Sequence, residues 1–180
     1  MVVSGLFILF CLLLVLTSYI EISNWNPLFR LYLLVQGNSK FNIDEVSNDS
    51  KIVLEFCYVF FGTKGRSPKV TFTRFKGNTI GTYNSDENKI VINLTNCKTY
   101  NSLVDVVIHE YIHHLQFKSV HAEDYHRILS MSGYNKHPLE FMASRMSEKY
   151  ARAALTYLLA EKKYLNISEN NSLLSAKKFL

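Results

Sequence analysis

The longest apolar stretch in this sequence is its first. Residues 2–20 carry no charged side chain, and as a helix they would reach about 28 Å, close to the hydrocarbon thickness of a bilayer. No basic residue precedes the stretch and no small-residue cleavage site follows it, which favours an anchor over a cleaved signal peptide. The pattern therefore predicts a transmembrane helix over residues 1–22, with a signal peptide and a buried core helix as alternatives.

A second apolar segment, Leu28–Val35, follows and is too short to cross a membrane. It fits either an amphipathic helix at the membrane surface or the first helix of a folded domain. The polar break at Gly37–Ser39 ends it. We therefore expect four regions: an anchor over residues 1–22, a juxtamembrane segment over 23–40, a folded domain over 41–165 and a polar tail over 166–180.

The pattern changes from helical to alternating early in the folded domain. Apolar residues spaced i, i+3, i+4 and i+7 predict a helix within residues 43–61. Alternation of apolar and polar residues then predicts three strands, at Val70–Phe75, Thr79–Tyr83 and Lys89–Leu94. Because the turns between them are short, we expect one antiparallel sheet.

Helical periodicity returns in the second half of the chain. Ser102–Asp105 fits a capping box that opens a helix running to about Phe117. Pro138 suits the first turn of a last helix that runs to about Tyr164. Together these elements predict an α+β domain.

The first of these two helices contains the stretch His109-Glu110-Tyr111-Ile112-His113, an HExxH pattern. Residues i and i+4 leave the same face of a helix, so both imidazoles suit one tetrahedral zinc ion (Zn2+). Glu110 lies beside that face, where it can act as general base on water. The alternative is a core helix with hydrogen-bonded histidines, but two histidines and a glutamate on a buried face need a reason.

A catalytic zinc ion needs a third protein ligand and one open position. Glu140 falls in the first turn of the last helix, where a carboxylate is favourable, and Ala143 one turn on allows the two helices to cross closely. His121 and His126 are alternative third ligands. Taken alone, Glu140 would be interpreted as an ordinary glutamate in the first turn of a helix. The HExxH pattern on the preceding helix favours its interpretation as the third ligand instead.

Other polar side chains near this constellation have weaker assignments. Tyr134 and His137 are the candidates for a hydrogen-bond donor to an oxyanion. His114 points about 100° away from His113 around the helix, so we expect it either behind the ligands, in contact with them, or on the surface. Asp105, one turn before His109, can accept the second ring N–H of that histidine, although a capping role is the simpler interpretation.

These motifs resemble those of one enzyme family. HEYIHHLQF followed by YNKHPLEFMA resembles a minimal gluzincin, and the preceding GTYNSDENKIVINL resembles the hairpin of ImmA/IrrE-like and SprT-like small zincins. The resemblance covers about Val70 to Ala154. It implies a zincin-like fold in which a small antiparallel sheet packs on the HExxH helix and on a second, ligand-bearing helix. By the same resemblance His109, His113 and Glu140 correspond to the zinc ligands and Glu110 to the catalytic glutamate.

Composition and charge add limits on partners and location. Lys and Arg number 20 against 15 Asp and Glu, but they are scattered, so we expect no nucleic-acid partner. Arg30 and Lys40 follow the apolar run and none precedes it, which leans toward a single-pass membrane protein with a cytoplasmic domain. Cys57 and Cys97 fit two buried free thiols, or one disulfide outside the cell.

The sequence thus predicts a membrane-anchored zinc metallopeptidase whose partners are a protein or peptide substrate and, through the N-terminal helix, membrane lipid. The third strand, Lys89–Leu94, offers an edge for pairing with an extended substrate. Two alternatives remain: a non-catalytic, membrane-tethered zinc-binding or regulatory module, and a zinc hydrolase acting on a non-peptide bond. The presence of Glu110 argues against the first, because a structural site needs only ligands.

Overall fold

The computed structural model of the chain describes residues 27–63, 65–117 and 137–176, with residues 124, 127, 128, 130, 131 and 133 between them. The chain divides after Gly37 into two compact units. In the first, the described part lies within helix α2 (Pro27–Asn38), so the apolar segment Leu28–Val35 is helical. The second unit contains the remaining elements.

The expectation of a single-pass membrane protein with a cytoplasmic domain is wrong for the part of the chain that the structure describes. No helix there combines the length and the apolar character that a membrane span requires. Helix α6 (Pro138–Ala176) is long enough at 39 residues, but charged side chains recur along it. The run over residues 2–20, on which the expectation of an anchor rested, lies outside the described residues.

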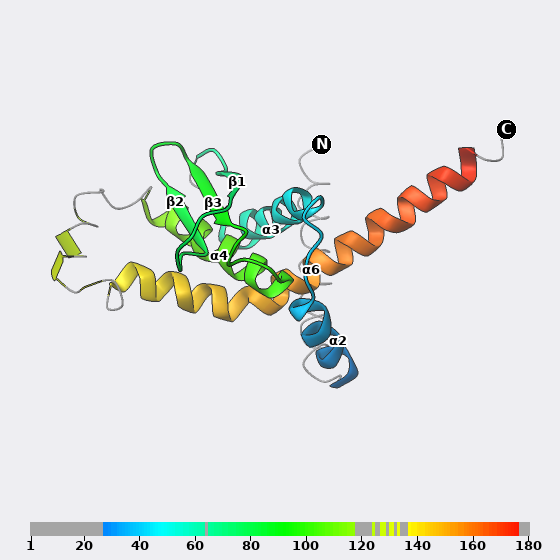
Figure 1. The fold of residues 1–180 in the computed structure, drawn as a ribbon, viewed down its shortest axis with the longest axis horizontal. Coiled ribbons are helices and arrows are strands. Elements are labelled where there is room, and N and C mark those ends of the chain that lie inside the picture. The colour runs from blue at the N-terminus through cyan, green and yellow to red at the C-terminus, as the bar shows by residue number, and fades with distance from the viewer. Residues whose placement is uncertain are drawn as a thin grey trace, which may run out of the picture. The chain divides into compact units, whose positions relative to one another are not determined.

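The second unit is an α+β structure, as predicted (Figure 1). Its elements follow the order α3 (Val46–Phe61), β1 (Lys69–Thr73), β2 (Gly81–Asn84), β3 (Lys89–Asn93), α4 (Tyr100–Phe117) and α6. Cys57 and Cys97 are buried free thiols, which confirms the first of the two interpretations offered for them.

The three strands form a mixed sheet in the order β1-β3-β2, so the prediction of an antiparallel sheet is wrong. β3 pairs in parallel with β1 and antiparallel with β2. The side chain of Asn93, at the end of β3, explains the difference: its amide donates to Phe75 O at 3.2 Å and to Thr79 O at 3.1 Å. The chain between β1 and β2 is therefore held across the end of β3, which places β3 in the centre.

Helix α4 packs against β2 and β3 as well as against α3 and α6. Most of its side chains are buried for this reason, including fully buried Leu103, Val107 and Ile108. The helix begins three residues earlier than a Ser102–Asp105 box requires. Thr99 Oγ1 accepts from the Ser102 N–H at 3.2 Å and Ser102 Oγ accepts from the Thr99 N–H at 3.0 Å, so the capping box is Thr99–Ser102.

Helix α6 packs along α4 through small buried residues, which allow the two backbones to come close. Ala143 and Ala154 are fully buried and Ser147 is nearly so. The helix continues to Ala176, beyond the predicted end near Tyr164, so residues 166–176 of the expected polar tail are helical.

An ion cluster joins the end of this packed region to the start of α3. Lys162 Nζ, on α6, lies 2.9 Å from Asp49 Oδ1 and 2.6 Å from Glu45 Oε2, and 5.2 Å from the centre of the Tyr100 ring. Asp49 is only 1% exposed. Burial raises the pKa of Asp49 despite the hydrogen bond from Lys162, so the carboxylate depends on that one ammonium group.

We predict that Lys162→Met lowers the free energy of unfolding by about 3 kcal/mol, because it leaves the Asp49 carboxylate buried without a cation. Urea unfolding followed by circular dichroism measures the change. Lys163→Met, at the exposed neighbouring position, is the matched control. Adding Asp49→Asn to Lys162→Met should restore part of the loss; a double variant no more stable than the single one contradicts this account.

Candidate metal centre

Three polar side chains from two helices meet on the α4–α6 contact. His109 and His113 lie one turn apart on α4, and their Nε2 atoms are 3.1 Å from each other. Glu140, in the first turn of α6, places Oε2 3.4 Å from His109 Nε2 and Oε1 3.3 Å from His113 Nε2. His113 and Glu140 are buried and His109 is partly exposed. The structure thus brings together the three residues that the sequence singled out as ligands.

The spacing of these atoms fits a bound metal ion. Ligand atoms at 2.0–2.1 Å from a tetrahedral centre lie about 3.3 Å from one another. The two Nε2 atoms are 3.1 Å apart, and each lies 3.3–3.4 Å from a different oxygen of the Glu140 carboxylate. Two imidazole nitrogens and a carboxylate oxygen form a donor set that such an ion accepts. The cluster can therefore hold a metal ion, and His109 keeps one side of it open to solvent.

Gln116 fixes the orientation of His113. Its amide nitrogen donates to Leu139 O at 3.1 Å, and its Oε1 lies 2.8 Å from His113 Nδ1. A carbonyl oxygen only accepts, so the amide must present its NH₂ to Leu139 and its oxygen to the ring. His113 Nδ1 therefore carries the proton, and the lone pair of Nε2 faces His109 and Glu140. Leu139 is the neighbour of Glu140 in the chain. The Gln116 amide therefore links the helix turn that carries His113 to the turn that carries Glu140.

His113 is held in a strongly acidic setting. Burial by itself would lower the pKa of the imidazole, but the hydrogen bond to Glu140 and the charges of Glu110 and Glu140 outweigh burial and raise it. A divalent cation at the cluster offsets the same negative charges.

Glu110 lies beside the cluster and is 6% exposed. Burial raises the pKa of its carboxyl group, and so does the charge of Glu140, while His113, His109 and the backbone N–H of Tyr83 lower it. A carboxylate shifted upward in this way is a better proton acceptor at neutral pH than a solvated one. The burial thus suits a base.

Strand β2 approaches α4 closely at Gly81. A Cβ atom at that position would lie 2.3 Å from Val106 Cγ2 and 3.3 Å from Glu110 Cγ, so any side chain there would clash with Val106 and force the strand and the helix apart or the valine to move. This contact brings the sheet edge up to the candidate base. It also corrects the expectation that the third strand pairs with substrate: β3 is paired on both sides, and β2 is the edge next to the cluster.

The other predicted site residues have different positions. His114 is fully buried and faces the sheet, where its Nδ1 lies 3.1 Å from the Tyr83 hydroxyl. His137 is buried at the start of α6, and its Nδ1 accepts the Leu139 N–H at 3.2 Å, so it caps the helix. Its predicted role toward an oxyanion stays a prediction. Tyr134, His121 and His126 lie outside the described residues.

Sequence reasoning missed Gln116 and Gly81. Gln116 follows His113 by three residues, so a polar side chain next to a ligand on the same helix face was the available signal. Gly81 carried no comparable signal, because glycine in a short strand has several explanations.

Comparison of the chain with protein families, curated proteins and solved structures gives no significant match. The candidate metal centre therefore stands on its own geometry.

We predict that Gln116→Met lowers the affinity for added zinc by about 10- to 100-fold, because the similar-sized side chain cannot hold the His113 tautomer. Isothermal titration of the metal-free protein measures it. Gln116→Glu keeps an acceptor for His113 but loses the donor to Leu139, so we expect an intermediate affinity. Wild-type affinity in Gln116→Met, with a folded circular dichroism spectrum, contradicts the role given to Gln116.

Proposed function

We propose that this protein is a zinc-dependent metallopeptidase. The observation that carries the proposal is the placement of a buried, upward-shifted carboxylate, Glu110, beside the cluster of His109, His113 and Glu140. A purely structural metal site has no use for this carboxylate. Two imidazoles and one carboxylate, with a side open to solvent, are the donor set of catalytic zinc sites.

Each residue has a part in the proposed reaction. His109, His113 and Glu140 would hold zinc, which when bound supplies Lewis acidity that polarises a carbonyl and lowers the pKa of water. Glu110 accepts a proton from the water that attacks the scissile carbonyl, and then returns it to the leaving amine nitrogen as the C–N bond breaks. The protons balance, because water supplies one to Glu110 and the new carboxylic acid receives the hydroxyl.

The position of β2 supports a peptide as substrate. β2 is the edge of the sheet beside the cluster, and its backbone contacts the neighbourhood of Glu110 at Gly81 and Tyr83. An extended peptide paired with this edge would place its backbone carbonyls along the open side of the centre.

Two variants of the full chain test the proposal. Glu110→Gln should retain zinc and lose about 10²–10⁴-fold in peptide cleavage, because the shape remains and the base is lost. His113→Ala should lose zinc as well as cleavage, because a ligand is removed. Glu55→Gln, an exposed position on α3, is the control for an acid-to-amide change. Metal content is measured by mass spectrometry and cleavage with a library of quenched fluorescent peptides.

Three outcomes contradict parts of the proposal. Wild-type cleavage by Glu110→Gln means that Glu110 is not the base. A wild-type protein that binds zinc and cleaves no peptide in the library favours a non-catalytic binding module or a non-peptide substrate. Unchanged zinc content in both His109→Ala and His113→Ala means that these histidines do not bind zinc, which contradicts the proposed metal centre.

A further inference from the structure

A cavity of about 810 Å³ opens beside the candidate metal centre. One wall is α4, which contributes His109 and Glu110, and a second wall is the first half of α6. The third is the stretch that leads into β2, from Asn78 to Gly81. A group bound here would therefore lie next to both a candidate ligand and the candidate base.

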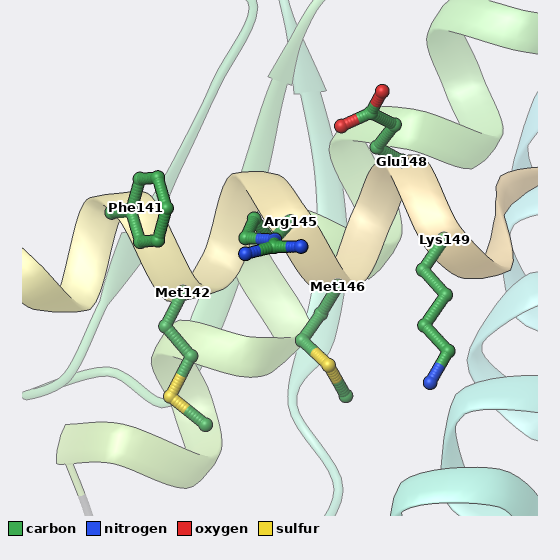
Figure 2. A pocket seen from close by; sticks show the side chains of 6 residues that line it. All are labelled: Phe141, Met142, Arg145, Met146, Glu148 and Lys149. Carbon is green, nitrogen blue, oxygen red and sulfur yellow. The ribbon is translucent and has the colours of Figure 1, made fainter.

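The charged side chains in the walls of this cavity are acidic apart from His109. Asp105 comes from α4, one turn before His109, and Glu148 comes from α6 on the facing wall. The charge of Glu148 acts on Asp105, so the two carboxylates face the same space. Among the described residues, no Lys or Arg lines the cavity. Glu148 also borders a second hollow on α6, which Arg145 and Lys149 line as well, and Lys149 extends from the opposite side of the helix (Figure 2).

These two carboxylates lack a cation in the described part of the chain. The ion pairs recorded there involve other acids, and neither Asp105 nor Glu148 takes part in one. Burial is the main cause that raises the pKa of Asp105, and Glu148 adds to it; hydrogen bonding to Ser147 and the charge of His109 lower it. Both side chains are exposed to solvent, and the repulsion between the two like charges is unfavourable in the free protein. A cationic ligand would relieve it.

The cavity also has an apolar part. Ile80, Val106 and Ala151 line it together with the carboxylates. Lys and Arg side chains bury their methylene stems against apolar surface and extend a charged group beyond it, so they match this combination of walls. A free metal ion would leave the apolar walls and most of the volume unused.

We propose that this cavity is a specificity pocket that binds a Lys or Arg side chain of the substrate next to the cleaved bond, with Asp105 and Glu148 contacting its cationic end. The proposal rests on the peptidase function proposed above and names its substrate class. The hydroxyl groups of Ser144 and Ser147 in the same wall supply acceptors for the remaining N–H groups of the cation.

The test compares cleavage of three quenched peptides that differ at one position, with Lys, Arg or Gln there, in each register that the library identifies. The full-length wild-type protein should cleave the Lys and Arg peptides about tenfold better than the Gln peptide, as kcat/KM. Asp105→Asn and Glu148→Gln should each reduce this preference about threefold, and the double variant should abolish it. The ratio of two substrates cancels any effect of Asp105 on the metal centre.

Further arms separate the proposal from its rivals. Glu148→Lys should invert the preference toward a Glu peptide, whereas Glu55→Gln, which removes a charge on α3, should leave the ratio unchanged. Equal cleavage of the three peptides by wild type, or an unchanged ratio in the double variant, overturns the pocket while leaving the peptidase function intact. If acetylation of the peptide N-terminus abolishes cleavage regardless of Lys or Arg, the cavity holds an α-amine and the proposal is wrong. Absence of cleavage of every peptide overturns the proposed function and this inference with it.

Discussion

The contact between α4 and α6 is the constraint on which the rest of the structure depends. It places the Glu140 carboxylate against His109 and His113, with one carboxylate oxygen 3.4 Å from His109 Nε2 and the other 3.3 Å from His113 Nε2. A buried carboxylate is costly unless it has a partner, so this contact is favourable only when the imidazoles or a cation face it. Gln116 adds to the same contact, because its amide binds His113 on one helix and the Leu139 carbonyl on the other. The same contacts therefore hold the two helices together and set the geometry of the candidate metal centre.

The sheet packs against α4 and brings a strand edge close to the candidate base. Asn93 holds the chain across the end of β3, which sends β2 to the edge nearest the helix. Gly81 then lets β2 approach until its backbone borders Glu110. A sheet with the strands in sequence order would put β2 in the centre and leave no edge beside the candidate base. The connection between β1 and β2 therefore places an open strand edge and one wall of the cavity next to the candidate base.

The ionisable groups around the two histidines are mainly acidic. Glu110, Glu140 and Asp105 gather around the two histidines, and the pKa of Glu110 and that of Asp105 are raised chiefly by burial. Asp105 is exposed, whereas Glu110 and Glu140 are buried, and a buried excess of one sign is unfavourable unless a ligand offsets it. Elsewhere the same chain compensates its buried acid, since Asp49 is paired with Lys162. The contrast supports cations as ligands of this region: a metal ion at the cluster, and the basic substrate group inferred for the cavity.

The sequence by itself determined the elements and the ligand-bearing turns. Periodicity located α3, α4 and the strands within a few residues, and the HExxH spacing with Pro138-x-Glu140 identified the three residues that converge, because these depend on contacts within one helix or turn. The tertiary structure alone decided the rest. Strand order depended on hydrogen bonds of Asn93 to residues 14 and 18 positions away. Thr99, not Ser102, caps the N-terminus of α4, so Asp105 has no capping role. Asp105 instead lines the cavity, where α6 places Glu148 in the facing wall. Such roles arise from pairs distant in the chain, and no local pattern records which distant segment will pack there.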